Sequence, residues 1–122
     1  MTSMTGAPCK VLIFLKRRPG MTVEEFRDYY ENRHRPLVSN YLAGVTRYVR
    51  RYLEPLPHID TKEMTEPEFD VITELWFDRN DAFEGMLNMV RFGTLPKEII
   101  EDEERVFDRP RTRYVWLTEC EG

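Results

Sequence analysis

The sequence predicts an α+β domain in which helices cover one face of a four-stranded antiparallel sheet. Three observations predict this class. The length of 122 residues suits a single domain. The expected elements follow the order β-α-β-β-α-β, and the expected strands are apolar on both faces. Short connections and right-handed crossovers fold this order into a sheet whose first and last strands are antiparallel neighbours, with two helices on one face.

The chain begins with a polar segment and then an apolar strand. Residues 1–8 are small and polar, so we expect a disordered tail followed by a single domain over residues 9–122. The apolar run of residues 9–16 predicts a strand, and the basic Pro-Gly segment of residues 17–20 predicts the turn that ends it.

A broken helix follows this turn. Thr22 and Glu25 have the spacing of a capping box, in which each side chain bonds the backbone N–H of the other residue. Apolar residues then recur at steps of three and four: Val23, Phe26 and Tyr30. Pro36 disfavours helical geometry at Arg35, so we expect the first helix to end there. A short second helical piece is expected to end at Gly44.

Two strands and a long loop occupy the middle of the chain. Residues 45–53 alternate well enough to predict a strand, and residues 69–77 form the clearest strand pattern in the sequence. Residues 54–68, between them, contain three prolines and little periodicity. A loop of this length is often a lid or a binding loop.

The last third of the chain predicts two helical pieces and a final strand. Asp81 is expected to cap a helix that ends at Gly93. Pro96 can start a further acidic helix that continues to Glu104. The final strand is expected over residues 111–119.

Composition and charge argue against several classes of partner. The net charge is −4, and 18 basic residues are interleaved with 22 acidic ones. Nucleic-acid binding usually needs a basic face, so we expect no nucleic-acid partner. The sequence shows neither a membrane-length apolar run nor a signal-peptide pattern, and it has only two cysteines. We therefore expect a cytoplasmic protein with no membrane partner.

Apolar residues on both faces of the strands predict a homodimer. Two helices can cover only one face, and an exposed apolar face usually marks an interface. We expect a second copy to pack sheet against sheet; the alternative is that loop 54–68 folds over the second face. Glu74 shares a face with Ile72 and Trp76 and needs a partner, for which Arg47 or Arg113 is suitable.

Three segments resemble the EthD-domain family. Residues 16–36 contain basic residues, Pro-Gly, a capped helix with aromatic residues and then His-x-Pro. Residues 67–78 contain an aromatic-Asp pair before a strand that ends Glu-Leu-Trp-Phe, and residues 102–108 contain an acidic pair followed by Phe-Asp. The resemblance implies a ferredoxin-like, dimeric α/β barrel with a pocket between sheet and helices. The wider superfamily includes lactone isomerases, polyketide cyclases and dehydratases, and cofactor-free oxygenases, so the resemblance does not specify a reaction.

His34 is the leading candidate for a catalytic residue. It matches the His-x-Pro position and follows Tyr30 by one turn on the apolar face of the helix, where an imidazole can exchange a proton near neutral pH. The alternative is that His34 caps the end of the broken helix. Asp108 matches the last acidic position of the third segment, and it is expected either to orient His34, to be a second acid or base, or simply to end a helix.

Aromatic residues supply the other candidates. Tyr30 is a candidate for the catalytic group as well, and with Tyr41 it could bond a substrate oxygen, or both could simply pack in the core. Other residues are expected to bind substrate by shaping the pocket: Phe14, Trp76 and Trp116. His58 lies in the long loop and is expected either to face solvent or to close over the pocket.

These features predict a cofactor-independent enzyme that transfers protons on a small cyclic or aromatic, polyketide-like compound. The reaction would be that of an isomerase, a dehydratase or another lyase, with His34 as general acid or base. The two histidines and two cysteines lack metal-ligand spacing, so we expect no metal and no cofactor. The alternatives are a non-catalytic dimer that binds a hydrophobic ligand, a cofactor-free oxygenase acting on an electron-rich aromatic compound, and a structural interaction module.

Overall fold

The computed structural model describes residues 9–122, and the tail expected over residues 1–8 lies outside them. Its elements in chain order are β1 (Cys9–Leu15), α1 (Val23–Tyr29), η1 (Tyr30–His34), α2 (Arg35–Ser39), β2 (Val45–Tyr52), β3 (Val71–Phe77), α3 (Asn80–Phe92), α4 (Lys97–Val106), η2 (Arg109–Arg111) and β4 (Arg113–Trp116). In the described part of the chain, no helix combines the length and apolar character needed to cross a membrane.

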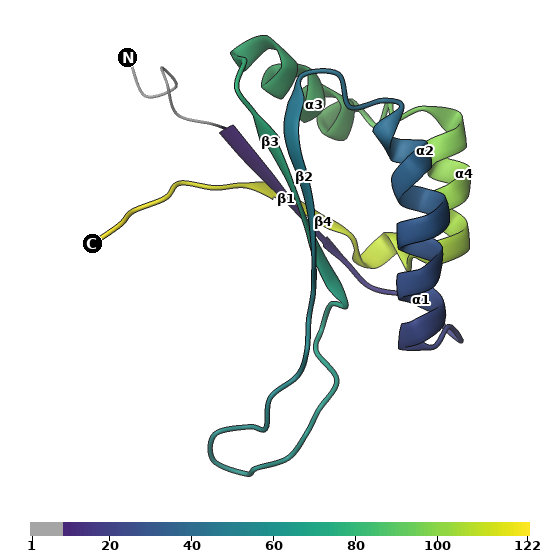
Figure 1. The fold of residues 1–122 in the computed structure, drawn as a ribbon, viewed down its shortest axis with the longest axis vertical. Coiled ribbons are helices and arrows are strands. Elements are labelled where there is room, and N and C mark those ends of the chain that lie inside the picture. Colours follow the sequence, from purple (N-terminus) through teal and green to yellow (C-terminus); the bar gives the residue numbers. More distant parts are fainter. Residues whose placement is uncertain (1–8) are drawn as a thin grey trace.

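The four strands form one antiparallel sheet in the order β2-β3-β1-β4. This order is that of a ferredoxin-like fold, and it confirms the expected pairing of the first and last strands. All helices lie on one face of the sheet, while the other face is open (Figure 1).

The residues that face the helices form two hydrophobic clusters. One cluster packs beneath α3 and has Val11, Leu75 and Phe83 at its centre. The other packs beneath α1 and α4 around Phe26 and Val106, both of which are fully buried. Ile13 and Tyr48 contact both clusters and therefore lie where the two groups of helices meet over the sheet.

The N-terminal helix starts as predicted but does not end as predicted. The Thr22 side chain accepts from Glu25 N at 3.1 Å, and the Glu25 side chain accepts from Thr22 N at 2.9 Å, so the capping box is confirmed. The expected break before Pro36 is wrong, because Arg35 is helical, with φ −58° and ψ −48°. The helix widens into the π-helical turn η1, and the Arg35 N–H reaches back to the carbonyl of Tyr30. This wider turn comes directly before the proline, and it lets the helix pass a residue that has no N–H to donate.

The later elements differ from the prediction mainly at their ends. Asp81 does not cap α3, which starts one residue earlier; its side chain pairs with Arg79 within the first turn. Gly93 ends α3 in the left-handed conformation, with φ 64°, as expected. α4 continues to Val106. β4 starts later than predicted because the 3-10 turn η2 occupies the residues up to Arg111, and it ends at Trp116, before the predicted end at residue 119.

The loop between β2 and β3 extends beyond the end of the sheet and does not fold over the open face (Figure 1). The alternative in which this loop covers the second face is therefore wrong for the single chain. The base of the loop is held by Asp70, whose carboxylate accepts from the backbone N–H and the guanidinium of Arg17 at 2.8 and 2.6 Å.

The open face combines apolar and charged side chains. Leu12 lies between Glu74 and Val115 on the neighbouring strands, so these three residues share this face. The partner of Glu74 is Arg51, and neither Arg47 nor Arg113 bonds it. The register pairs Glu74 with Val49, and Arg51 lies two residues further along the same face of β2.

The turn between α2 and β2 packs directly against α3. Gly44 has φ 85°, a value that favours glycine. A Cβ atom at this position would lie 2.5 Å from the Cβ of Ala82, so a larger residue would force the two segments apart.

Candidate functional site

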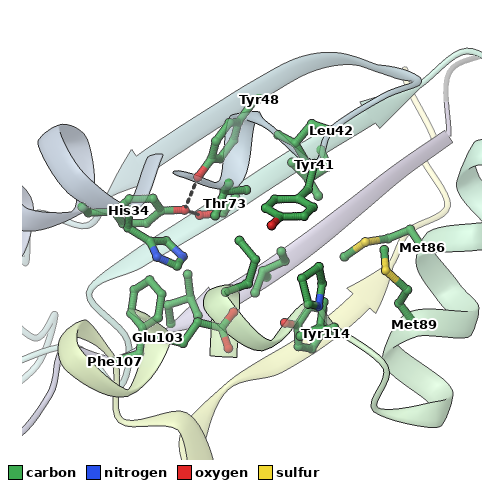
Figure 2. A pocket seen from close by; sticks show the side chains of 18 residues that line it. His34, Tyr41, Leu42, Tyr48, Thr73, Met86, Met89, Glu103, Phe107 and Tyr114 are labelled. Atoms are coloured by element: carbon green, nitrogen blue, oxygen red, sulfur yellow. Dashed lines mark hydrogen bonds between the residues drawn. The ribbon is translucent and has the colours of Figure 1, made fainter. Parts of the chain in front are cut away.

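A cavity of about 130 Å³ lies between the sheet and the helices. Its floor includes Thr73, Ile13 and Tyr114, which lie side by side on β3, β1 and β4. Most of its other lining residues are apolar or aromatic: Leu15, Val38, Tyr41, Leu42, Leu75, Met86, Met89, Leu95, Pro96, Ile99 and Phe107. Figure 2 shows the methionines of α3 at one end and His34 at the other. The cavity is therefore apolar along most of its length and polar at the end that holds the imidazole.

His34 is buried and is held by a carboxylate. Its Nδ1 lies 2.8 Å from Asp102 Oδ2, and only 3% of the residue is exposed. The second oxygen of Asp102 accepts a hydrogen bond from the Tyr29 hydroxyl at 2.6 Å, and the Arg105 guanidinium lies 3.6 Å from the same oxygen. Asp102 is thus anchored on both oxygens while it holds the imidazole.

The charge of Asp102 fixes the proton on the ring. Burial alone would raise the pKa of Asp102, but the hydrogen bonds from Tyr29 and His34 lower it below its usual range. An ionised carboxylate can only accept, so Nδ1 of His34 must carry the hydrogen of this bond. Nε2, for which no described residue provides a hydrogen-bond partner, is then the nitrogen that a ligand can reach.

Aromatic rings hold the imidazole plane in place. The ring of His34 meets Tyr30 and Phe107 edge to face, at centroid distances of 5.4 and 5.0 Å. Tyr30 and His34 are the first and last residues of η1, so the π-helical turn directs both side chains into the cavity. Turns of this kind are frequent at functional sites.

A chain of hydroxyl groups lies beside the imidazole. Tyr48 donates to the Tyr30 hydroxyl at 3.1 Å, and the Tyr30 and Thr73 oxygens lie 2.5 Å apart (Figure 2). Burial raises the pKa of Tyr48 to about 12 and that of Tyr30 well above its ordinary value. Both phenols therefore stay protonated and neutral, and they can act as hydrogen-bond donors across the physiological range.

A second carboxyl group enters the cavity from α4. Glu103 lines the cavity, and its Oε1 accepts a hydrogen bond from Arg109 Nε at 2.9 Å. Burial raises the pKa of Glu103, and the adjacent guanidinium of Arg109 opposes that rise. Burial also raises the pKa of Tyr114, with the charge of Glu103 contributing.

Three of the candidates from the sequence line the cavity together: His34, Tyr30 and Tyr41. Asp108 does not line it. Asp108 directly precedes the turn η2, and its backbone N–H bonds the carbonyl of Lys16. The carboxylate that holds His34 is that of Asp102.

The four remaining candidates lie elsewhere in the molecule. Phe14 and Trp76 point to the open face, because their neighbours along the strands face the helices. Trp116 lies on the helix side but outside the cavity, with its ring 6.2 Å from that of Phe83, and it is 55% exposed. His58 belongs to an exposed turn of the long loop, where its Nδ1 accepts backbone N–H groups of that turn.

The sequence reasoning missed Asp102, Glu103, Tyr48 and Tyr114. A signal for Asp102 was available, because Ile99, Asp102 and Val106 follow the spacing of one helical face and all three are buried. A carboxylate at an apolar position of a helix usually has a partner across the interior. In residues 9–122, no group of three or more metal-ligating side chains is assembled.

Comparisons with solved structures show the same fold. An EthD-family protein from Bacillus halodurans C-125 is 18% identical over 92% of this chain and 99% of that chain, with a TM-score of 0.59. An EthD-like protein from Ralstonia eutropha JMP134 is 21% identical over 90% of this chain and 87% of that chain, with a TM-score of 0.56. A hypothetical protein from Arabidopsis thaliana is 9% identical over 97% and 93% of the two chains, with a TM-score of 0.54.

A comparison with curated proteins gave no match. The sequence profile described as the EthD domain, however, matches residues 18–110, which include α1, η1, the whole of β3, and α4 with Asp102 and Glu103. This match covers more than half of the chain. The protein is therefore a member of the EthD-domain family.

Proposed function

We propose that the cavity binds a small cyclic or aromatic molecule and that His34 transfers a proton on it as general acid or base. The observation that carries the proposal is the buried pair of His34 and Asp102, which leaves Nε2 as the ring nitrogen available to a ligand in a mostly apolar cavity. The reaction class is that of an isomerase, a dehydratase or another lyase, and its proton steps need no group beyond these side chains.

The proposed mechanism uses two polar features of the cavity, the His34–Asp102 pair and the hydroxyl chain of Tyr48, Tyr30 and Thr73. Nε2 of His34 takes a proton from the carbon next to a carbonyl, and Asp102 stabilises the imidazolium that forms. The electron pair moves to the carbonyl oxygen. When the Thr73 hydroxyl donates to Tyr30, the Tyr30 oxygen accepts two hydrogen bonds, one from Thr73 and one from Tyr48. The Tyr30 hydroxyl can then donate its own hydrogen to the carbonyl oxygen of the substrate. The imidazolium then returns the proton to a second atom of the substrate.

A second copy of the chain is part of this proposal. The open face carries Leu12, Phe14, Ile72 and Val115, and Val115 is 43% exposed. Burying such a face contributes roughly 25 cal/mol per Å² of apolar area. We propose that two copies pack through their open faces, which leaves the cavity on the helix-covered side of each.

Acetophenone provides a test of the proton transfer. Its single ring suits a cavity of this size, and exchange of its methyl protons in D₂O is followed by NMR. We expect the protein to accelerate the exchange, and His34→Gln to lower the accelerated rate by about 10²-fold or more while acetophenone still binds. Asp102→Asn, which alters only the group that positions His34, should lower kcat more than it changes KM.

The matched control is His58→Gln, which makes the same change in the exposed loop and should leave the exchange rate unaltered. Exchange in His34→Gln at the rate of the unchanged protein would contradict the catalytic role. Binding of acetophenone with no exchange in any form of the protein would instead favour the second reading, a dimer that only binds a hydrophobic ligand. The apolar lining of the cavity is the observation that supports this second reading.

A further inference from the structure

The Glu103–Arg109 pair presents its two charges unequally to the cavity. The Glu103 side chain is only 12% exposed, and Figure 2 shows its carboxyl group directed into the cavity near Tyr114. The Arg109 side chain is 37% exposed and does not line the cavity. A molecule in the cavity therefore meets the carboxylate of this pair first, and the guanidinium lies behind it.

The rest of the lining supplies no cation to balance this carboxylate. None of the described residues that line the cavity is a lysine or an arginine. The charge behind His34 is also negative, because Asp102 holds the imidazole from the far side at 2.8 Å. The polar end of the cavity thus combines the carboxylate of Glu103 with neutral hydroxyl groups, and the carboxylate of Asp102 lies behind the imidazole.

The size of the cavity limits the ligand to about one ring. A closed apolar cavity of about 150 Å³ holds a benzene molecule, and this cavity measures about 130 Å³. Met86 and Met89 at the opposite end are flexible side chains that can move aside for a small substituent.

We propose, on the basis of the proposed function, that the cavity selects uncharged single-ring compounds that carry a carbonyl, amide or hydroxyl group, and that Glu103 excludes carboxylates. An uncharged oxygen can accept from the hydroxyl chain of Tyr48, Tyr30 and Thr73 or approach His34. A carboxylate in the same place would lose its hydration and face the charge of Glu103 across a medium of low dielectric constant. Arg109 maintains this exclusion because the guanidinium favours the charged form of Glu103.

Three probes of nearly the same shape test this proposal: acetophenone, benzamide and benzoate. Their affinities are measured by NMR titration at neutral pH with the full chain. We expect acetophenone and benzamide to bind, and benzoate to bind at least about tenfold more weakly. Glu103→Gln should bring the benzoate affinity to within about threefold of the benzamide affinity. The matched control is Glu104→Gln, which removes the same charge from the exposed face of α4 and should leave the tenfold difference intact.

Each result has a defined meaning. Benzoate binding as tightly as benzamide to the unchanged protein would overturn the proposal, and this comparison needs no variant to fold. A tenfold difference that persists in folded Glu103→Gln, or in Glu103→Leu should the first variant unfold, would overturn the role of Glu103. Failure of all three probes to bind would contradict the proposed function itself, which separates the two failures.

Discussion

Two adjacent carboxylates on α4 have opposite properties because their surroundings differ. Asp102 accepts from Tyr29 and His34, and these donors lower its pKa despite burial. Glu103, the next residue, faces an apolar cavity with Arg109 as its hydrogen-bonded partner, and burial raises its pKa. Environments that separate the pKa values of neighbouring groups are typical of acid–base sites. At the scale of single residues, the pKa of each carboxylate in the site therefore depends on which donors reach its oxygens and on how deeply it is buried.

The hydroxyl chain beside His34 should also contribute to stability. Tyr30→Phe removes a buried hydroxyl and leaves the Thr73 and Tyr48 oxygens without that partner. We expect the free energy of unfolding to fall by about 1–2 kcal/mol, as measured by denaturant titration. Tyr41→Phe is the control, since Tyr41 is 41% exposed and its hydroxyl has no bond of this kind among the described residues. Equal stability of Tyr30→Phe and the unchanged protein would show that the hydroxyl chain contributes nothing to the free energy of unfolding.

Residue patterns predicted His34 as a site residue but not Asp102, its partner in the buried pair. His34 stood out because an imidazole occupied a position where a helix normally places an aliphatic side chain. One of the three roles considered for Asp108 was to orient His34, whereas in the structure Asp102 holds the imidazole. Asp102 lies within α4, whereas Asp108 lies two residues beyond the end of this helix, and the rotation of α4 about its axis brings Asp102 to His34. That rotation is set by the packing of Ile99 and Val106, which contacts across the whole fold determine.

At the scale of elements, the π-helical turn η1 determines where His34 points. In a π-helical turn the bonded residues are five positions apart in place of four, so the turn acts as a one-residue insertion in an α-helix. Without it, every side chain beyond the turn would rotate by about 100° around the helix axis. The contact between His34 and Asp102 therefore depends on this extra residue.

Deletion of Asn32 tests this dependence. Asn32 is exposed on η1, and its side chain bonds only Asp28 in the described part of the chain. We expect the deletion to restore α-helical bonding, to keep the circular dichroism of the helices and to abolish the catalysed exchange, because His34 no longer meets Asp102. Asn32→Ala keeps the length of the turn and should retain activity. Full activity after the deletion would show that η1 has no part in orienting the site.

The sequence predicted the elements well where the signals are local. The capping box of Thr22 and Glu25 and the glycine end at Gly93 depend on neighbouring residues only, and both are present. The rule applied to Pro36 is also local, yet it failed, because the helix absorbs the proline by widening its preceding turn. Burial of Tyr30 and His34 stabilises that wider turn, and burial of this kind depends on the tertiary fold.

At the scale of the whole molecule, the sheet has two different faces. One face supports the helices and the cavity, and the other carries apolar residues among charged pairs such as Arg51 and Glu74. Alternation along the strands showed that both faces are apolar, but it could not show which face the helices cover. For this reason Phe14 and Trp76 were expected in the pocket, whereas the register places them on the open face.

A charge on the open face should separate the proposed dimer. Val115 lies beside Leu12 on this face, so Val115→Glu would bury a carboxylate without a partner in a sheet-to-sheet interface. We expect the unchanged protein to sediment as a dimer and Val115→Glu to shift toward the monomer. Leu56→Glu, at an 84% exposed position of the long loop, should remain dimeric. A monomeric unchanged protein, or a Val115→Glu variant that stays dimeric, would contradict the proposed interface.

The close approach of Gly44 to Ala82 holds two segments that line the cavity at a short distance from each other. One helical turn after Ala82, the same helix places Met86 in the cavity wall, whereas Gly44 belongs to the turn that follows α2 and carries Tyr41 and Leu42. The distance between these two parts of the cavity lining is thus limited by a contact that leaves no room for a methyl group at Gly44. In the proposed function, the space for a ligand therefore depends in part on Gly44, which does not line the cavity.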